Sequence, residues 1–327
     1  MKYSAYYVEE IDGVFSASIS ELELKKPSDG FVQIQVSCSS LNYKDALSAS
    51  GNKGVTRNYP FVPGIDAAGT ISDANSSNFV EGDEVLVTGY DMGMNTPGGF
   101  GEFINVPANW VVKKPSALTS IEAMSIGTAG LTAAASVLKI QESSQESDLP
   151  VLVSGATGGV GSIGVMLMSK LDKEVTALTG KSSSVDFLKS IGAKNVILRD
   201  DFLEGPVKPI ERALFYSAID TVGGNVLSKM LTQISPHGVV ECSGNVAGIE
   251  VNTTVFPFIL RGITLAGIDS AESSLEFKTN VWRKFANEWK LDLSPIIKVV
   301  SKENLQQEID LILQGGQQGR VVLKHGE

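Results

Sequence analysis

The stretch that most constrains this chain lies at residues 151–162, with the sequence VLVSGATGGVGS. Residues of strand character lead into a glycine-rich turn, and an apolar pattern of helical spacing follows. A strand, a glycine turn and a helix in this order suit a dinucleotide, because the turn and the helix N-terminus direct backbone N–H groups at a pyrophosphate. We therefore predict a nucleotide-binding loop, with a glycine-rich turn that holds no ligand as the alternative.

The glycine spacing in this stretch matches G-x-G-x-x-G, except that Ala156 stands in the first glycine position. Gly158 would let the backbone approach the phosphates, and Gly161 would let the helix pack closely on the strand. The loop residues expected to bind the cofactor are Ala156, Thr157, Gly158, Gly159 and Val160.

The residues after the second strand of this βαβ unit indicate whether the cofactor is NAD or NADPH. A strand predicted at 174–178 follows the glycines at the spacing of a βαβ unit, and it ends in the sequence TGKS at 179–182. An NAD enzyme would place an acid there to hold the ribose 2′-hydroxyl, whereas a lysine and hydroxyl groups would hold a 2′-phosphate. The sequence therefore predicts NADPH, with a solvated lysine as the alternative. The residues expected at this end are Thr179, Gly180, Lys181 and, just past the next strand, Arg199.

The composition argues against several classes of partner. The chain has 327 residues and a formal net charge of −10, and no cluster of Lys and Arg interleaves with aromatic residues. Nucleic acid and anionic membranes are therefore not expected as partners. No apolar run reaches the roughly 20 residues that span a bilayer, and the first residues lack the pattern of a signal peptide. We expect a cytoplasmic protein of two domains.

The cysteines and histidines predict that no metal is bound. Cys38 and Cys242 are too few for a zinc lobe, which needs four cysteines at short spacing. We expect Cys38 to pack as a small apolar residue and Cys242 to be an inert thiol at a strand end. His237 and His325 are isolated in the sequence, and we expect both to be solvated.

The pattern along the chain changes in its middle. Residues 1–120 consist of short strands and turns, which is typical of a partly open β-barrel. From residue 151 strands alternate with helices, which predicts a doubly wound parallel sheet, and the polar residues 141–148 are expected to form a surface loop. The expected strands are 2–8, 31–38, 65–71, 84–88, 103–106, 110–112, 151–154, 174–178, 195–198, 214–220, 238–242, 262–268 and 320–323. The expected helices are 131–138, 162–171, 183–191, 226–233, 277–289 and 304–313, with a further helix starting near Ser120.

Two predicted strands end in loops of small residues, DTVGG at 220–224 and CSGN at 242–245. An open α/β sheet binds its ligand at the carboxyl ends of its strands, so a nicotinamide and its ribose could lie there. Gly244 and Asn245 are the candidate contacts, and ordinary turns are the alternative.

Further motifs, in their order and spacing, make the chain similar to a known family over essentially its whole length. They are NYKD at 42–45, PGIDAAG at 63–69, GDEVLVTG at 82–89, IGTAGLTAA at 126–134, the loop at 220–224, PFILRG at 257–262 and GIDS at 267–270. The chain resembles the medium-chain dehydrogenase/reductase superfamily, in its zinc-independent quinone oxidoreductase branch, of the YhdH/YhfP type of acrylyl-CoA reductases. Zinc-dependent members carry His-Glu where this chain has Ile65-Asp66. The segment MGMNTP at 92–97 departs from relatives, which usually have a bulkier aromatic residue or histidine there.

The resemblance implies a GroES-like catalytic domain at 1–121 and 267–327, and a Rossmann domain at 122–266, with the active site in the cleft between them. It implies transfer of hydride from NADPH to the β-carbon of an α,β-unsaturated thioester such as acrylyl-CoA. Asn42 and Tyr43 are then the candidates that hold the enoyl carbonyl, and Tyr43 could also supply a proton or contact the cofactor. Packing at a strand end is the alternative for Tyr43. Further implied cofactor contacts are Thr128, Thr132, Ile268 and Ser270; for the two threonines, hydroxyls bonded within a helix are the alternative.

Two classes of function stay open at this point. The first is an NADPH-dependent reductase that acts on a small enoyl thioester, an enone or a quinone, and we expect it to be a homodimer. The second is a non-catalytic NADPH-binding protein, such as a redox sensor. Steady oxidation of NADPH by an added enone or acrylyl-CoA separates the two classes.

Overall fold

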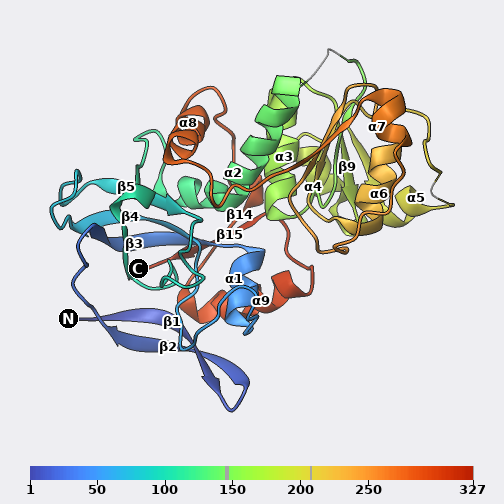
Figure 1. Cartoon of the computed structure of the whole chain (residues 1–327). Coiled ribbons are helices and arrows are strands. Elements are labelled where there is room, and N and C mark those ends of the chain that lie inside the picture. The colour runs from blue at the N-terminus through green and yellow to red at the C-terminus, as the bar shows by residue number, and fades with distance from the viewer. Residues whose placement is uncertain (144–146, 207, 327) are drawn as a thin grey trace. The chain divides into compact units, whose positions relative to one another are not determined.

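The computed structural model describes residues 1–143, 147–206 and 208–326, and its internal contacts divide the chain into two compact units (Figure 1). Unit 1 comprises Met1–Thr128 and Ala271–Glu327, and unit 2 comprises Ala129–Ser270. The sequence placed the boundaries a few residues earlier, at 121 and 267. Of the loop expected at 141–148, residues 144–146 lie outside the described residues, and 141–143 belong to a helix.

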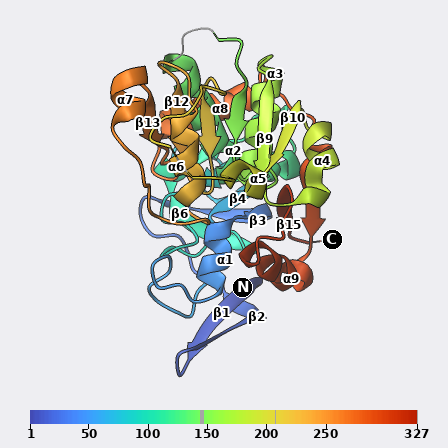
Figure 2. The same ribbon diagram turned by 90° about the vertical axis from the view of Figure 1, so that its right-hand side faces the viewer.

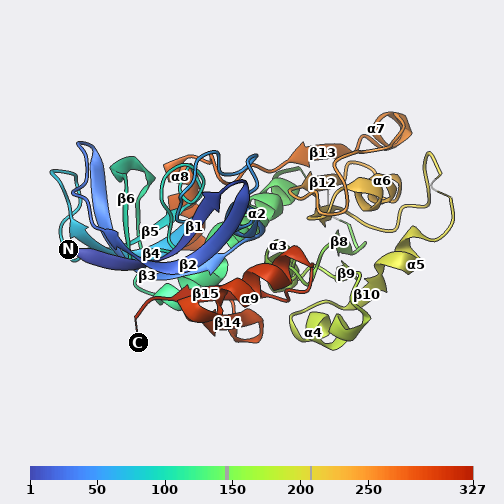
Figure 3. The ribbon, with the colours of Figure 1, turned by 90° about the horizontal axis from the view of Figure 1, so that it is seen from below.

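Unit 1 is built mainly from antiparallel strands. A seven-stranded sheet has the order β14-β15-β3-β4-β5-β7, with β6 also paired to β3, and β1 and β2 form a separate hairpin (Figure 3). The strands of unit 1 are β1 (Lys2–Ile11), β2 (Val14–Glu23), β3 (Phe31–Leu41), β4 (Asp66–Asp73), β5 (Glu84–Thr88), β6 (Phe103–Pro107), β7 (Val112–Lys113), β14 (Ile297–Val300) and β15 (Arg320–Lys324). Its helices are α1 (Tyr43–Ala49), α8 (Leu275–Ala286) and α9 (Lys302–Leu313), with short 3-10 turns at Ala108–Trp110 and Ser294–Ile296. This is the partly open β architecture that the sequence predicts.

The core of unit 1 follows from alternation along β3. Val32, Ile34 and Val36 are buried in one apolar cluster, and Cys38 is also buried. Strand residues at this spacing point to the same face, so the alternation places one continuous apolar row in the core.

Unit 2 is a doubly wound parallel sheet, as predicted (Figure 2). The strand order is β10-β9-β8-β11-β12-β13, and every pairing in it is parallel. Its strands are β8 (Val151–Val153), β9 (Val175–Thr179), β10 (Asn195–Leu198), β11 (Ala218–Asp220), β12 (Val239–Cys242) and β13 (Thr264–Gly267). Its helices are α3 (Gly159–Lys170), α4 (Val185–Ser190), α5 (Arg199–Leu203), α6 (Gly224–Thr232) and α7 (Phe256–Arg261), with a 3-10 turn at Ser182–Ser184.

Helix α2 (Ser120–Ser143) runs across the boundary between the two units and is broken at Gly127, which has φ +49° and ψ −159°. The helix begins as the sequence predicts, because Thr119 and Glu122 bond to each other's backbone N–H groups in a capping box. By length and composition it could cross a membrane, but most of its apolar window is buried within the protein. It is therefore best described as a core helix.

The structure differs from the predicted local structure in four places. No helix is predicted at residues 43–49, but Tyr43 opens helix α1 after Asn42. His325 was expected to be solvated, but it is buried and its Nε2 lies 2.8 Å from the Gly99 carbonyl oxygen. Strands β2 and β14 and the short helices α5 and α7 were not predicted. Strand β14 and helices α5 and α7 have only four to six residues, which is too short for a repeating apolar pattern. Strand β2 was overlooked, although Phe15, Ala17 and Ile19 alternate with serines along it. The expected strand at 214–220 is shorter, since only Ala218–Asp220 pair within the parallel sheet and Phe215 forms an isolated bridge with Ile234.

Candidate active site

The glycine loop of unit 2 connects β8 to α3, and two glycines in it are required by close packing. Gly155 has φ +54°, and a Cβ there would overlap the Thr221 hydroxyl. A Cβ at Gly161 would overlap the Gly155 carbonyl oxygen, so Gly161 lets α3 start tight against the strand. The residue with a left-handed backbone conformation is thus Gly155 and not Ala156. Alanine is therefore tolerated at the position of the first glycine in G-x-G-x-x-G.

Helix α3 begins at Gly159, three residues earlier than predicted, with Gly158 as its N-cap residue. The first-turn N–H groups of any α-helix have no acceptor within the helix, and here they belong to Gly159, Val160 and Gly161. With the positive end of the helix dipole they form a cradle that suits a pyrophosphate.

At the end of β9, the Arg199 guanidinium lies against Gly180. A Cβ on Gly180 would be 3.2 Å from the guanidinium carbon of Arg199, so the absence of a side chain at Gly180 makes room for it. Thr179 Oγ1 accepts a 3.0 Å hydrogen bond from the Lys181 backbone N–H, which fixes the turn after the strand. Partial burial lowers the pKa of the Lys181 amine. Arg199 beside Gly180 fits the 2′-phosphate of NADPH, because a cation lies at the strand end where an NAD enzyme would place an acid.

A cavity of about 100 Å³ lies at the carboxyl ends of these strands, and its lining includes Gly155, Thr179, Gly180 and Arg199. Ligand pockets commonly enclose about 300 Å³ or more, so a dinucleotide would have to extend along the open strand ends beyond this cavity. Lys181 is not among the lining residues, which makes Arg199 the better placed of the two cations.

The ends of β11 and β12 pack on each other through backbone contacts. A Cβ on Gly244 would overlap the Thr221 carbonyl group, whereas Asn245 is exposed. Asp220 is buried, accepts hydrogen bonds from Ser154 Oγ at 2.6 Å and Gly223 N at 2.8 Å, and burial raises its pKa. Asp220 therefore shapes the loop after β11, and Gly244 is required by close packing on that loop.

Two other predicted cofactor residues of unit 2 come together. The Thr132 and Ser270 hydroxyl oxygens lie 2.6 Å apart, although 138 positions separate them in the sequence. Ile268 precedes Ser270 and is held by a 3.0 Å bond from its N–H to the Cys242 carbonyl oxygen. The Thr132 hydroxyl thus bonds outside its own helix.

In unit 1, the predicted catalytic pair stands at the start of α1. Asn42 is the buried N-cap residue, and its backbone N–H donates to Asp45 Oδ2 at 2.8 Å. Tyr43 is the first residue of the helix, and its side chain is 38% exposed. Tyr43 is therefore not packed in the core, which argues against the purely structural alternative for it.

Asn42 belongs to a buried polar group that the sequence did not predict. We call it the Asp66 cluster, and its members are Ser40, Asn42, Asp45, Asp66, Thr128 and Arg320. The Asn42 amide donates to Asp66 Oδ2 at 2.9 Å and to Asp45 Oδ2 at 3.1 Å. The hydroxyls of Ser40 and Thr128 both donate to the Asp66 carboxylate, as does the Thr128 backbone N–H at 2.9 Å. The Thr128 hydroxyl thus also bonds outside its own helix.

The charges of this cluster are removed from water. Asp45 and Asp66 are fully buried and Arg320 is 2% exposed. Burial, with the nearby Asp66 charge, raises the pKa of Asp45 to about 7, although hydrogen bonds from Asn42 and Ile65 oppose the shift. Burial also lowers the pKa of Arg320, and the two carboxylates oppose that shift. The Arg320 Nε donates to the Ser125 carbonyl oxygen at 2.9 Å, which ties β15 to α2.

The described residues contain no group of three or more His, Cys, Asp or Glu side chains that could hold a metal ion. His237 is exposed in a turn, and His325 is buried and bonded to the Gly99 carbonyl oxygen, so neither histidine contributes a hydrogen bond to the Asp66 cluster as the structure describes it. The site therefore has to be understood through hydroxyl, amide and carboxylate groups.

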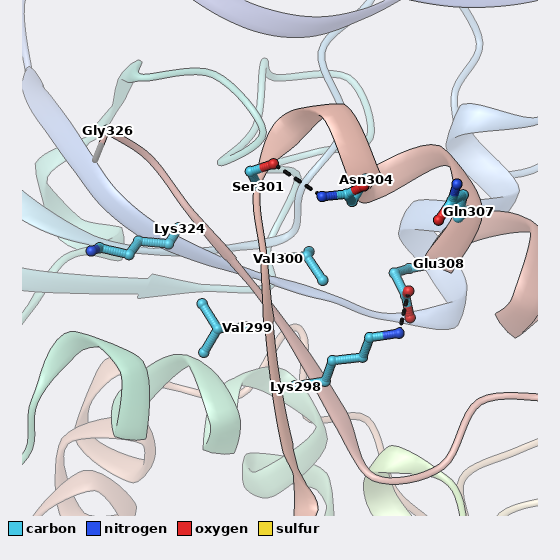
Figure 4. Close-up of a pocket in the computed structure, with 9 residues that line it drawn as sticks. All are labelled: Lys298, Val299, Val300, Ser301, Asn304, Gln307, Glu308, Lys324 and Gly326. Carbon is cyan, nitrogen blue, oxygen red and sulfur yellow. Dashed lines mark hydrogen bonds and ion pairs between the residues drawn. The ribbon is translucent and has the colours of Figure 1, made fainter.

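A larger cavity in unit 1, of about 500 Å³, lies between β14, β15 and α9 (Figure 4). Lys298 and Glu308 form an ion pair across it at 2.6 Å, and the Lys324 side chain points away from this pair. None of the predicted site residues lines this cavity. Its size alone does not make it the active site.

The chain is similar in sequence to known oxidoreductases. Residues 28–116 match the family described as the alcohol dehydrogenase GroES-like domain. The chain is 42% identical to the "Putative quinone oxidoreductase YhfP" of Bacillus subtilis (strain 168), over 91% of each chain. It is 36% identical to acrylyl-CoA reductase AcuI of Ruegeria pomeroyi, over 96% of each chain.

Two solved structures of such relatives have the same fold as this chain. The crystal structure of YhdH from Escherichia coli K-12 with bound NADPH has a TM-score of 0.94 at 38% identity, and the match covers 98% of this chain and 100% of that one. The crystal structure of Bacillus subtilis YhfP with NAD bound has a TM-score of 0.95 at 38% identity, and the match covers 99% of each chain.

Proposed function

We propose, from the premise that this chain belongs to the medium-chain dehydrogenase/reductase superfamily and resembles its YhdH/YhfP members, that it is an NADPH-dependent reductase of α,β-unsaturated acyl thioesters such as acrylyl-CoA. The observation that carries the cofactor assignment is the Arg199 guanidinium on Gly180, at a strand end without an acid. The reaction is taken from the relative named as acrylyl-CoA reductase. The reductases of this family named for quinones supply the second candidate, an NADPH-dependent quinone reductase.

The residues of unit 2 would bind and orient the cofactor. The first-turn N–H groups of α3 would hold the pyrophosphate, and Arg199 with Lys181 would hold the 2′-phosphate. Thr132, Ser270, Ile268, Gly244 and Asn245 would contact its nicotinamide half. Bound NADPH would supply the hydride for the β-carbon of the substrate.

The residues of unit 1 would act on the substrate. The exposed Tyr43 hydroxyl would donate a hydrogen bond to the thioester carbonyl, where negative charge develops as hydride arrives, and its ring would pack on the nicotinamide. Asn42 has both amide hydrogens bonded to carboxylates, so it would hold the start of α1 rather than donate to the substrate. Thr128 would be a further cofactor contact.

A substrate panel tests this function. Purified protein would be mixed with NADPH and acrylyl-CoA, a simple enone or a quinone, and NADPH absorbance followed. We expect steady turnover that is fastest, by kcat/KM, with acrylyl-CoA, and a far lower rate when NADH replaces NADPH. A faster quinone reaction would select the second candidate. Tight NADPH binding without turnover of any substrate would favour the non-catalytic redox sensor.

We also propose that the protein is a homodimer in the cytoplasm. Strand β13 is the end strand of the parallel sheet and is largely exposed, and exposed apolar side chains lie on it and in the segment just before it. They include Phe256, Ile259, Leu260 and Leu265. An exposed strand edge beside an apolar patch suits pairing with the same strand of a second copy about a two-fold axis.

The mass of the protein in solution, measured by light scattering, tests the dimer. We expect twice the chain mass for the wild type and a monomer for the double variant Ile259→Glu/Leu260→Glu. A wild-type monomer at micromolar concentration would contradict the proposal. Fractionation of the source cells tests the cytoplasmic location.

A further inference from the structure

The Asp66 carboxylate collects donors from three segments that are distant in the sequence. Ser40 lies near the end of β3, Asn42 is the N-cap residue of α1, and Thr128 follows the break in α2. All three donate side-chain hydrogen bonds to the same carboxylate, which is fully buried at the start of β4. Removing a buried carboxylate that accepts from several donors costs more free energy than breaking one of its hydrogen bonds, because each donor is left unpaired.

The bonds to Asp66 determine how Asn42 is oriented. One amide hydrogen is directed at Asp66 and the other at Asp45, since the nitrogen lies 2.9 Å and 3.1 Å from their Oδ2 atoms. The amide cannot turn over without placing its own oxygen against two carboxylates. The backbone that leads into Tyr43 is thereby held in one position.

The bonds to Asp66 also determine how the second part of α2 begins. The Thr128 backbone N–H lies 2.9 Å from Asp66 Oδ2, and its hydroxyl donates to Oδ1. A carboxylate at the start of a helical segment satisfies an N–H group that lacks an intrahelical partner and interacts favourably with the helix dipole. Asp66 thus acts as a cap supplied from β4.

Asp66 and Ser40 pack tightly against Gly127, the residue at which α2 is broken. A Cβ on Gly127 would lie 2.6 Å from Asp66 Oδ2 and 2.7 Å from Ser40 Oγ, so the carboxylate fills the volume beside the glycine. The Arg320 Nη2 group is close to the same point and is buried without a hydrogen-bond partner among the described residues. The carboxylate has the arginine charge beside it and three donors around it.

We propose that Asp66 is a positioning residue of the reaction, which sets the places of Tyr43, through Asn42, and of Thr128 with a single buried charge. The inference rests on the proposed function, because it takes Tyr43 and Thr128 as residues of the active site. Asp66 itself touches neither substrate nor cofactor in this account. Its loss would displace two parts of the active site together while the fold around them persists.

Two adjacent serines provide a matched pair of variants. Ser40 and Ser39 are both fully buried and both donate to Asp66, but Ser40 bonds to the carboxylate and Ser39 bonds to the backbone carbonyl oxygen at 2.6 Å. Ser40→Ala therefore perturbs the carboxylate, whereas Ser39→Ala removes a similar bond without touching it. We expect Ser40→Ala to lower kcat about fivefold with little change in KM, and Ser39→Ala to leave kcat within about twofold of the wild type.

The stronger variant is Asp66→Asn, which presents N–H groups to donors that need an acceptor. We expect its kcat, calculated per NADPH-binding site so that unfolded protein is not counted, to fall about 50-fold, with a smaller change in KM. Glu308→Gln is its control, because Glu308 is a buried carboxylate of the same unit that is bonded to Lys298. It should lower the melting temperature without changing kcat. If Asp66→Asn does not fold, the serine pair decides the matter.

Equal kcat values for the two serine variants, or a kcat of Asp66→Asn within twofold of the wild type, would overturn the proposal even if the variants are less stable. The failure of the proposed function gives a different result, in which the wild type itself turns over no substrate of the panel. In that case NADPH titration decides: Ser40→Ala should weaken NADPH binding about fivefold and Ser39→Ala should not. Equal NADPH affinities would then overturn the role of Asp66.

Discussion

The nucleotide end of unit 2 and the Asp66 cluster of unit 1 are polar regions built in opposite ways. The nucleotide end consists of glycines, the first-turn N–H groups of α3, which lack acceptors within the helix, and the half-exposed Arg199. The Asp66 cluster consists of buried or partly buried side chains, and Ser40, Asn42 and Thr128 in it direct their donors at the carboxylate of Asp66. The first region has donors for the phosphates of a ligand, whereas the donors of the second region already bind the carboxylate of Asp66.

This difference separates binding from positioning. Open donors contribute free energy only when the ligand arrives, so their removal should weaken one ligand and leave the fold intact. Buried paired groups contribute to the folded state itself, so their removal should reduce stability and displace whatever they hold. Each prediction below tests one side of this contrast.

The largest effect is expected where a side chain is forced into the cluster. Gly127→Ala would place a methyl group 2.6 Å from Asp66 Oδ2 on a residue with φ +49°. Left-handed strain and overpacking together should cost about 4 kcal/mol of the free energy of unfolding, measured by denaturant titration. Gly164→Ala in α3 is the control: its Cβ would meet only an ordinary contact at 3.4 Å, so its stability should change by less than about 1 kcal/mol. Similar losses of unfolding free energy in both variants would show that Gly127 is no more tightly packed against the Asp66 cluster than an ordinary helical glycine is against its neighbours.

A second effect on stability belongs to another closed region of unit 1. Burial lowers the pKa of His325 to about 4, well below the ordinary value of 6.5. The unfolded chain therefore binds the proton more readily, and the stability that His325 contributes at neutral pH should be lost as pH falls from 6.5 towards 4. The difference between wild type and His325→Gln in free energy of unfolding should shrink by about 3 kcal/mol across this range. A difference that is independent of pH would show that the imidazole is accessible.

Tyr43 tests the part of unit 1 that the cluster is proposed to hold. Tyr43→Phe keeps the ring and removes the hydroxyl, so kcat should fall about 100-fold with NADPH affinity almost unchanged. Tyr43→Ala should also weaken NADPH binding, because the ring is lost. A silent Phe variant beside a weakened Ala variant would restrict Tyr43 to packing on the cofactor. Wild-type behaviour in both variants would remove Tyr43 from the site.

The smallest effect, and the most selective, is expected at the nucleotide end. Arg199→Ala removes a charge-assisted contact and should raise the dissociation constant of NADPH about 10- to 100-fold, with that of NADH almost unchanged. Lys181→Ala should have the same selectivity, and the smaller effect if Arg199 is the better placed cation. Fluorescence titration of both cofactors measures this. Equal weakening of NADPH and NADH would contradict the assignment of the 2′-phosphate.

The same contrast explains how much the sequence could predict. The nucleotide end depends on neighbours in the chain, since a glycine turn between a strand and a helix can be recognised within a dozen residues, and even there Gly155 rather than Ala156 carries the left-handed turn. The Asp66 cluster joins positions 40, 66, 128 and 320, and no local pattern links a buried aspartate to a threonine 62 positions away. Asn42 and Tyr43 were selected only through family resemblance, and the roles of their partners required the structure.

The most direct test of the proposed function follows a label from cofactor to product. The wild-type protein would be incubated with acrylyl-CoA and NADPH that carries deuterium at both C4 positions of the nicotinamide, and the thioester product would be examined by NMR. The account predicts one deuterium on the β-carbon and a solvent hydrogen on the α-carbon. Deuterium on the α-carbon, or a reduced product that carries none, would contradict it.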